Sequence, residues 1–141
     1  MTDFNPDTFL TEEQNVILET EFTAIPEGDY DGIIKDIKPD TTPKGSHLLA
    51  VTWLIDSEEV REHTGMPEPT CRQTIWLDLD ENGKLAGGSN KNIGLGKLRD
   101  ALGQNDGSPW SPSMLLGQPA YVHVAPDKTG QYSNVVQVAP R

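Results

Sequence analysis

The chain has 141 residues, with 22 acidic and 11 basic side chains and a net charge of −11. This length fits one domain with a substantial core. The charge argues against a nucleic-acid binder, because phosphate-binding proteins usually carry a basic surplus. The single cysteine, Cys71, excludes an internal disulfide and a cysteine-rich zinc site. No segment reaches the ~20 apolar residues of a membrane span, and the start lacks a signal-peptide pattern. We therefore expect a cytoplasmic protein with no membrane partner.

The negative charge is concentrated near the N-terminus. Residues 1–31 contain nine acidic side chains and no Lys or Arg, whereas the remaining 110 residues carry 13 acids and 11 bases. This distribution predicts an acidic arm over residues 1–24 and a nearly neutral body over residues 25–141. Within the arm, Thr11 and Gln14 have the spacing of a capping box, which predicts a short helix over residues 12–20.

The body begins with two predicted strands. The first spans residues 28–38, and Gly32 within it indicates a bulge or a tight bend. Turn-forming residues over 39–46 predict a loop. The second strand spans residues 47–57 and carries apolar side chains on both faces, so we expect both faces to be covered at least in part. A polar stretch with two prolines, residues 58–69, is predicted to be a loop.

The third predicted strand, residues 70–80, alternates with a period of two. One set of side chains belongs to the core on this pattern: Cys71, Gln73, Ile75, Leu77 and Leu79. The other set faces outward and is mostly polar, yet it includes a tryptophan: Arg72, Thr74, Trp76 and Asp78.

The rest of the chain supplies a turn, a helix and a hairpin. A turn over 81–89 precedes a predicted helix over 90–102, which Gly103 ends. A loop over 104–113 follows, and strands over 118–125 and 131–139 form a hairpin. Five strands with one helix between the third and fourth is the element order of the OB-fold, a mainly β, partly open Greek-key barrel. An α+β sandwich has the same order and remains an alternative.

Nothing in the sequence indicates catalysis. The three histidines are far apart and none has a metal-ligand spacing, and no Walker loop, HExxH motif or nucleophile elbow is present. We therefore expect no enzyme activity, no metal and no cofactor, and favour a binding protein.

The outward face of the third strand is the leading candidate site. OB barrels bind oligonucleotides on the face of strands two and three and on the flanking loops, and single-strand binders stack bases on aromatic rings. Trp76 lies ~13 Å from Arg72 on a strand, with Thr74 between them. Trp53 on the second strand is either a core residue or ligand-facing. The remaining candidates lie on the fourth strand, and in or near the loop between the first two strands and the loop between the last two. They are Lys35, Lys44, Lys128, Tyr121 and Tyr132.

Three stretches of the body resemble the small single-stranded DNA-binding proteins of tailed phages. IPEGDYDGIIKDIK is similar to their opening strand, TCRQTIWLDLDENGKL with NIGLGKLRDALG to their third strand and helix, and LLGQPAYVHVAPDKTGQYSNVVQVAP to their closing hairpin. The resemblance covers residues 25–140. It implies an OB-fold that coats single strands in phage DNA replication or recombination, in the host-cell cytoplasm. By the resemblance, five residues lie on or near the binding path: Trp76, Arg72, Trp53, Lys44 and Lys128.

Two features depart from that family. Gln118 stands where a Lys is common, which removes one phosphate contact. The family usually carries its acidic, partner-recruiting tail at the C-terminus, whereas this chain ends in VAPR and is acidic at its start.

The acidic arm therefore needs its own hypotheses. Its carboxylates and phenylalanines can mimic a DNA strand and compete with DNA for the binding groove of the barrel. Alternatively, they can recruit a basic replication or recombination protein. Two alternative functions remain for the whole chain: an acidic module or DNA mimic that inhibits a host enzyme, and a structural protein of the virion. Whether the chain forms a homo-oligomer also stays open.

Overall fold

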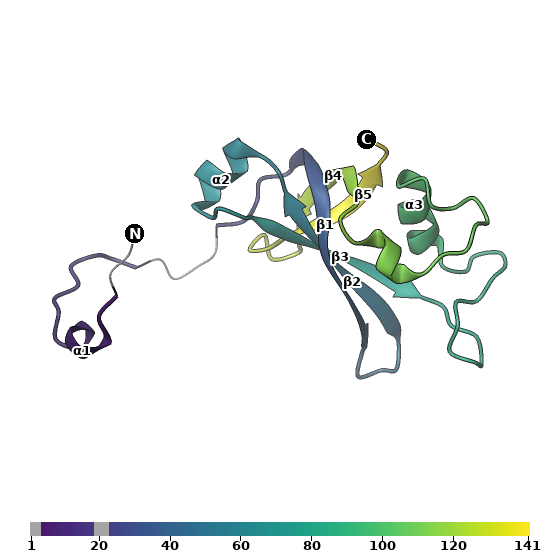
Figure 1. The fold of residues 1–141 in the computed structure, drawn as a ribbon, viewed down its shortest axis with the longest axis horizontal. Helices are drawn as coiled ribbons and strands as arrows, with labels where there is room; N and C mark the ends of the chain where they lie inside the picture. The colour runs from purple at the N-terminus through teal and green to yellow at the C-terminus, as the bar shows by residue number, and fades with distance from the viewer. Residues whose placement is uncertain (1–3, 19–22) are drawn as a thin grey trace.

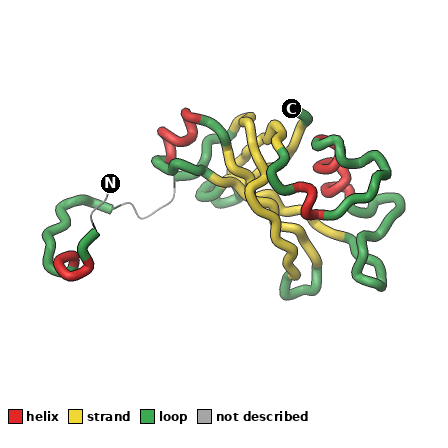
Figure 2. The backbone as a smooth tube through the Cα atoms, viewed as in Figure 1, coloured by secondary structure: helices red, strands yellow, loops and turns green. Residues whose placement is uncertain are grey.

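The computed structural model describes residues 4–18 and 23–141 and contains a closed five-stranded barrel (Figures 1 and 2). The strands follow the order β1-β2-β3-β5-β4 around the barrel, and only the β3–β5 pair is parallel. Their bounds are β1 Gly28–Thr41, β2 His47–Ile55, β3 Thr70–Leu77, β4 Pro119–Pro126 and β5 Ser133–Ala139. Helix α3, Ile93–Ala101, lies between β3 and β4 in sequence. The predicted mainly β, OB-like barrel is therefore confirmed.

Strand β1 joins β4 to β2 with its two halves. Residues 28–33 pair with β4, and residues 32–41 pair with β2. The register with β2 shifts between Ile34 and Asp36, so the predicted irregularity lies at Lys35 rather than at Gly32. β1 also extends through Thr41 into the predicted loop, which leaves a tight connection in which the Thr42 amide donates to the Ser46 carbonyl at 2.8 Å.

Gly32 has a packing role instead. A Cβ added at this position would lie 3.0 Å from Cε3 of Trp53 and 3.2 Å from both γ carbons of Val122. The missing side chain thus lets β1 pass closely over the largest core residue, at the point where β1 changes partner from β4 to β2.

The barrel interior is apolar and centred on Trp53, which is fully buried. Its indole Nε1 donates to Oε1 of Gln73 at 2.8 Å, so the polar atom of the ring is satisfied inside the fold. Helix α3 covers one opening of the barrel with Leu95 and Leu98, both buried.

The predicted loop over 58–69 is wrong in part, because Glu58–Thr64 forms helix α2. Oγ of Ser57 accepts from the amide of Val60 at the N-terminal end, and Gly65 ends the helix with a φ of 71°. Val60 is buried in the barrel core, which fixes α2 against it.

Helix α3 begins three residues later than predicted. Asn90 and Asn92 both have positive φ angles, so the residues before Ile93 form a turn. The Asn92 side chain joins this turn to the end of β3, since its Oδ1 accepts from the Asp78 amide and its Nδ2 donates to the Asp78 carbonyl.

The predicted helix of the arm is misplaced. The structure has a four-residue helix, α1, at Pro6–Phe9, capped by Oδ1 of Asn5. Residues 12–18 are not helical, and residues 19–20 lie outside the described residues. Proline at the first helical position and an Asn cap favour the earlier start. Every residue from 4 to 18 is exposed.

In the part of the chain that the structure describes, no helix is long and apolar enough to cross a membrane.

We expect Gly32→Ala to destabilise the barrel by about 1–3 kcal/mol, because its methyl group overpacks against Trp53 and Val122. Gly96→Ala is the matched control: it lies in α3 with no atom within 4 Å of the added Cβ, so it should stabilise by about 0.5–1 kcal/mol. Urea denaturation followed by circular dichroism measures both. Equal effects of the two substitutions would contradict the close approach of β1 to Trp53.

Candidate nucleic-acid interface

The outer face of β2 and β3 presents an exposed tryptophan among polar side chains. Three pairs of directly opposed residues form this surface, which we call the β2–β3 face: Leu48 and Trp76, Ala50 and Thr74, Thr52 and Arg72. Directly opposed residues share a face of the sheet. The Trp76 ring is 57 % exposed, and Arg72 and Thr74 are exposed beside it. The predicted alternation of the third strand is confirmed.

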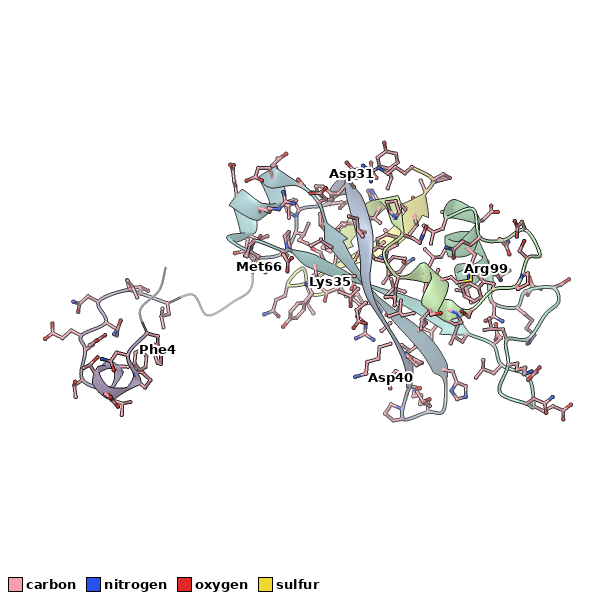
Figure 3. The ribbon with its side chains drawn as sticks, in the orientation of Figure 1. Phe4, Asp31, Lys35, Asp40, Met66 and Arg99 are labelled. Atoms are coloured by element: carbon pink, nitrogen blue, oxygen red, sulfur yellow. The ribbon has the colours of Figure 1, made fainter. Side chains whose placement is uncertain are left out.

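Strand β1 extends this face with charges of both signs. Lys38 is opposite Ala50, Asp36 opposite Thr52, and Asp40 opposite Leu48. Asp40 lies near the tip of the β1–β2 hairpin (Figure 3). The alternation of cation and carboxylate keeps the face close to neutral, so any phosphate contacts come from individual side chains rather than from a broad basic patch.

Loops with lysines lie at both ends of the β2–β3 face. Lys44 is exposed in the β1–β2 connection. At the other end, Arg72 pairs with Asn134, and the Cys71 thiol lies 3.1 Å from the Ser133 carbonyl, which brings the β4–β5 connection beside the start of β3. That connection carries Lys128 and Tyr132, both exposed.

The β4–β5 connection has a defined shape. Oδ1 of Asp127 accepts from the Thr129 hydroxyl at 2.7 Å and from the Thr129 amide at 3.1 Å. These hydrogen bonds, the hydroxyl first, hold the pKa of Asp127 below its usual range. The carboxylate therefore stays ionised beside Lys128 and offsets part of its charge.

Lys35 lies on β1 near the β2–β3 face and is partnered. Its Nζ is 3.3 Å from Oε2 of Glu68, and both side chains are largely exposed. Figure 3 labels Lys35 on β1. An exposed pair of this kind is worth about 0–1 kcal/mol, so a phosphate can replace the carboxylate at small cost.

The inclusion of Trp53 among the ligand-contacting candidates is wrong. The side chain is fully buried and packs in the barrel core, and its one polar atom binds Gln73. The neighbours Val51 and Ile55 on the same side of β2 are buried as well, so the whole inner side of the strand is core.

Tyr121 is exposed, but it lies away from the β2–β3 face. It is on β4, opposite Asp31 of β1 and Ala139 of β5. Tyr121 lines a groove of about 980 Å3 between α3 and strands β3, β4 and β5. Thr74 lines the same groove. The structure thus brings Arg72, Thr74 and Trp76 together on β3, whereas Tyr121 lies on another strand and shares with this set only the groove that Thr74 also lines.

Lys38 joins the face as a strand residue. The residue lay at the predicted end of the first strand, and the extension of β1 to Thr41 is what aligns it with Ala50 and Thr74. The signal for this extension is weak, because Pro39 and Asp40 are typical of turns.

Cys71, on the inner side of β3, is not a nucleophile at ordinary pH. Burial raises the pKa of its thiol to about 12, so the thiolate is absent. Over residues 4–18 and 23–141, no group of three or more His, Cys, Asp or Glu side chains is arranged to hold a metal ion.

The chain matches no protein-family model, and comparison with curated proteins finds no significant relative. We therefore infer a function from the barrel and from the chemistry of its faces.

The two tryptophans of β2 and β3 should differ in their effect on stability. We expect Trp53→Ala to lower the free energy of unfolding by about 3–5 kcal/mol through loss of core volume, and Trp76→Ala to change it by no more than about 0.5 kcal/mol. Chemical denaturation of both variants tests this. A large loss of stability in Trp76→Ala would mean that the ring is structural.

Proposed function

We propose that this protein binds single-stranded DNA without sequence preference on the β2–β3 face. The observation that carries the proposal is Trp76, a ring 57 % exposed beside Arg72 and Thr74 on an OB-like barrel. Aromatic rings on this face stack bases in OB-folds, and stacking tolerates any sequence because every base has a π-face. We propose binding rather than catalysis as the activity.

In the proposed mechanism, one base stacks on Trp76 while cations contact the phosphates. Stacking on one ring supplies about 1–3 kcal/mol. Arg72 is four residues away on the same strand, or ~13 Å along it, which suits a phosphate of a neighbouring nucleotide. Lys38 and Lys44 supply contacts toward one end of the face and Lys128 toward the other.

The charge balance limits the affinity. Asp36, Asp40 and Asp127 lie among the same cations, so few phosphates are neutralised. We therefore expect weak to moderate binding with a shallow dependence on salt, since the slope of log K against log salt is ~0.7 per phosphate contact for single strands. The resemblance to phage proteins leads us to propose phage DNA replication or recombination as the setting, in the host-cell cytoplasm.

A titration with oligothymidylate tests the proposal. We expect quenching of tryptophan fluorescence at low salt, and a loss of about 1–3 kcal/mol of binding free energy in Trp76→Ala. Trp110→Phe is the matched control, because that ring lies under the Arg99 guanidinium, 4.1 Å from it, and its Nε1 donates to Gln104. No quenching at low salt, or equal effects of both variants, would refute the proposal.

A second candidate function belongs to the acidic arm. Residues 4–18 are all exposed, and the rings of Phe4 and Phe9 lie 5.3 Å apart next to the capped helix α1. This combination of carboxylates and aromatic rings suits a basic, partly apolar cleft of a replication or recombination protein, or of a host enzyme. The same side chains also suit an arm that competes with DNA for the β2–β3 face.

Deletion of residues 2–24 separates these roles. It removes six carboxylates, so we expect tighter binding of oligothymidylate at low salt. The control replaces Phe4 and Phe9 with Ala and keeps the charges. Tighter binding in this control as well supports strand mimicry, an effect of the deletion alone supports repulsion of phosphates, and unchanged or weaker binding in both contradicts any competing role of the arm.

A further inference from the structure

A hollow beside helix α3 combines positive charge with exposed aliphatic surface. It has a volume of about 500 Å3. We call it the α3 hollow and define it by six of its lining residues: Leu85, Lys91, Ile93, Lys97, Arg99 and Asp100. Ile93 is 53 % exposed and Leu85 37 % exposed. Its three cations against one carboxylate give the α3 hollow a net positive charge.

The lysines of the α3 hollow are available to an acidic ligand. Lys91 and Lys97 form no ion pair with any residue in the described ranges. Arg99 is held in place, because its Nε donates to the Gln104 carbonyl at 3.0 Å and its guanidinium lies over the Trp110 ring. Figure 3 labels Arg99. Asp106 is close enough for Arg99 to help lower its pKa, after the hydrogen bonds with Ser108, so part of the Arg99 charge is offset and the lysines dominate.

The arm of the same chain has the complementary composition. Glu12 and Glu13 are exposed carboxylates. Val16, Ile17 and Leu18 follow, with exposures of 70 %, 101 % and 75 %. Three consecutive aliphatic side chains in water gain about 25 cal/mol for each Å2 of apolar surface that they bury. An acidic and aliphatic peptide suits the α3 hollow better than DNA does, because the hollow lacks an aromatic platform for bases.

We propose that residues 12–18 of one copy dock in the α3 hollow of a second copy. Glu12 and Glu13 then face Lys91 and Lys97, and the aliphatic residues cover Ile93 and Leu85. A second copy is favoured over the same chain by the geometry. The chain enters the barrel beside β5, where Ser133 Oγ donates to the Ile25 carbonyl at 2.6 Å, on the side of α2, whereas α3 lies on the opposite side (Figure 1).

Such an arrangement is head-to-tail. Each copy offers an arm at one end and a hollow at the other, so two copies can exchange arms in a closed dimer, or the contact can repeat from copy to copy in rings or open chains. This inference does not depend on DNA binding, and the association itself is measured without DNA.

Sedimentation velocity of the full chain tests the proposal over a range of protein concentrations. At low salt we expect the mean mass to rise with concentration, and at 1 M salt, where the Debye length is about 3 Å, the association should weaken. Lys91→Glu with Lys97→Glu, and separately Glu12→Lys with Glu13→Lys, should each raise the dissociation constant by about tenfold, since each reversal replaces attraction with repulsion.

Combining the four substitutions should restore association, because the charges are again opposite. The control, Lys38→Glu with Lys44→Glu, changes the same number of charges on the β1–β2 hairpin and should leave association unchanged. A monomer at every concentration overturns the proposal, and so does association that ignores the α3 substitutions. Weaker binding of oligothymidylate in Lys91→Glu with Lys97→Glu, together with unchanged association, identifies DNA as the occupant and overturns it as well.

Discussion

The close packing of β1 over Trp53 is the constraint on which the barrel depends. The ring fills the interior, and Gly32 provides the space for β1 to cross it while changing partner from β4 to β2. The two halves of β1 thus join β4 to β2 in the closed barrel. The register shift after Ile34 then redirects the second half of β1 along β2, and this half carries Lys38 onto the outer face.

Because Trp53 occupies the inside of the barrel, the alternation of β3 determines which of its side chains a ligand can reach. Cys71 and Ile75 face the same core, so Arg72, Thr74 and Trp76 must face solvent. The Trp76 ring is 57 % exposed on a strand face that is otherwise polar, so much of its surface is open to a ligand. The net charge of −11 does not conflict with a DNA-binding face, since nine of the eleven net negative charges lie in the first 31 residues and the face itself is nearly neutral. It does limit the affinity that such a face can reach.

Much of the barrel could be predicted from the sequence, because period-two alternation and turn residues are strong signals. The five strands, the helix after β3 and the outward side of Trp76 followed from them. Helix α2 did not: Ser57 and Gly65 are good capping residues, but Pro67 and Pro69 and the polar composition favoured a loop, and only the burial of Val60 makes the helix stable. Trp53 was ambiguous for a physical reason, since β2 is apolar on both sides and only barrel closure decides which side is inner. The separation of Tyr121 from Trp76 also depends on strand order, which a local pattern does not contain.

The most direct test of the central claim is to locate the bound strand. Oligothymidylate with 5-iodouracil at single positions can be photocrosslinked to the full chain, and the adducts identified by mass spectrometry. We expect adducts on Trp76, with Tyr132 as a second site at the end of the β2–β3 face nearer Arg72. Adducts confined to Tyr121 or to the residues around α3, with none on β3, would contradict the claim.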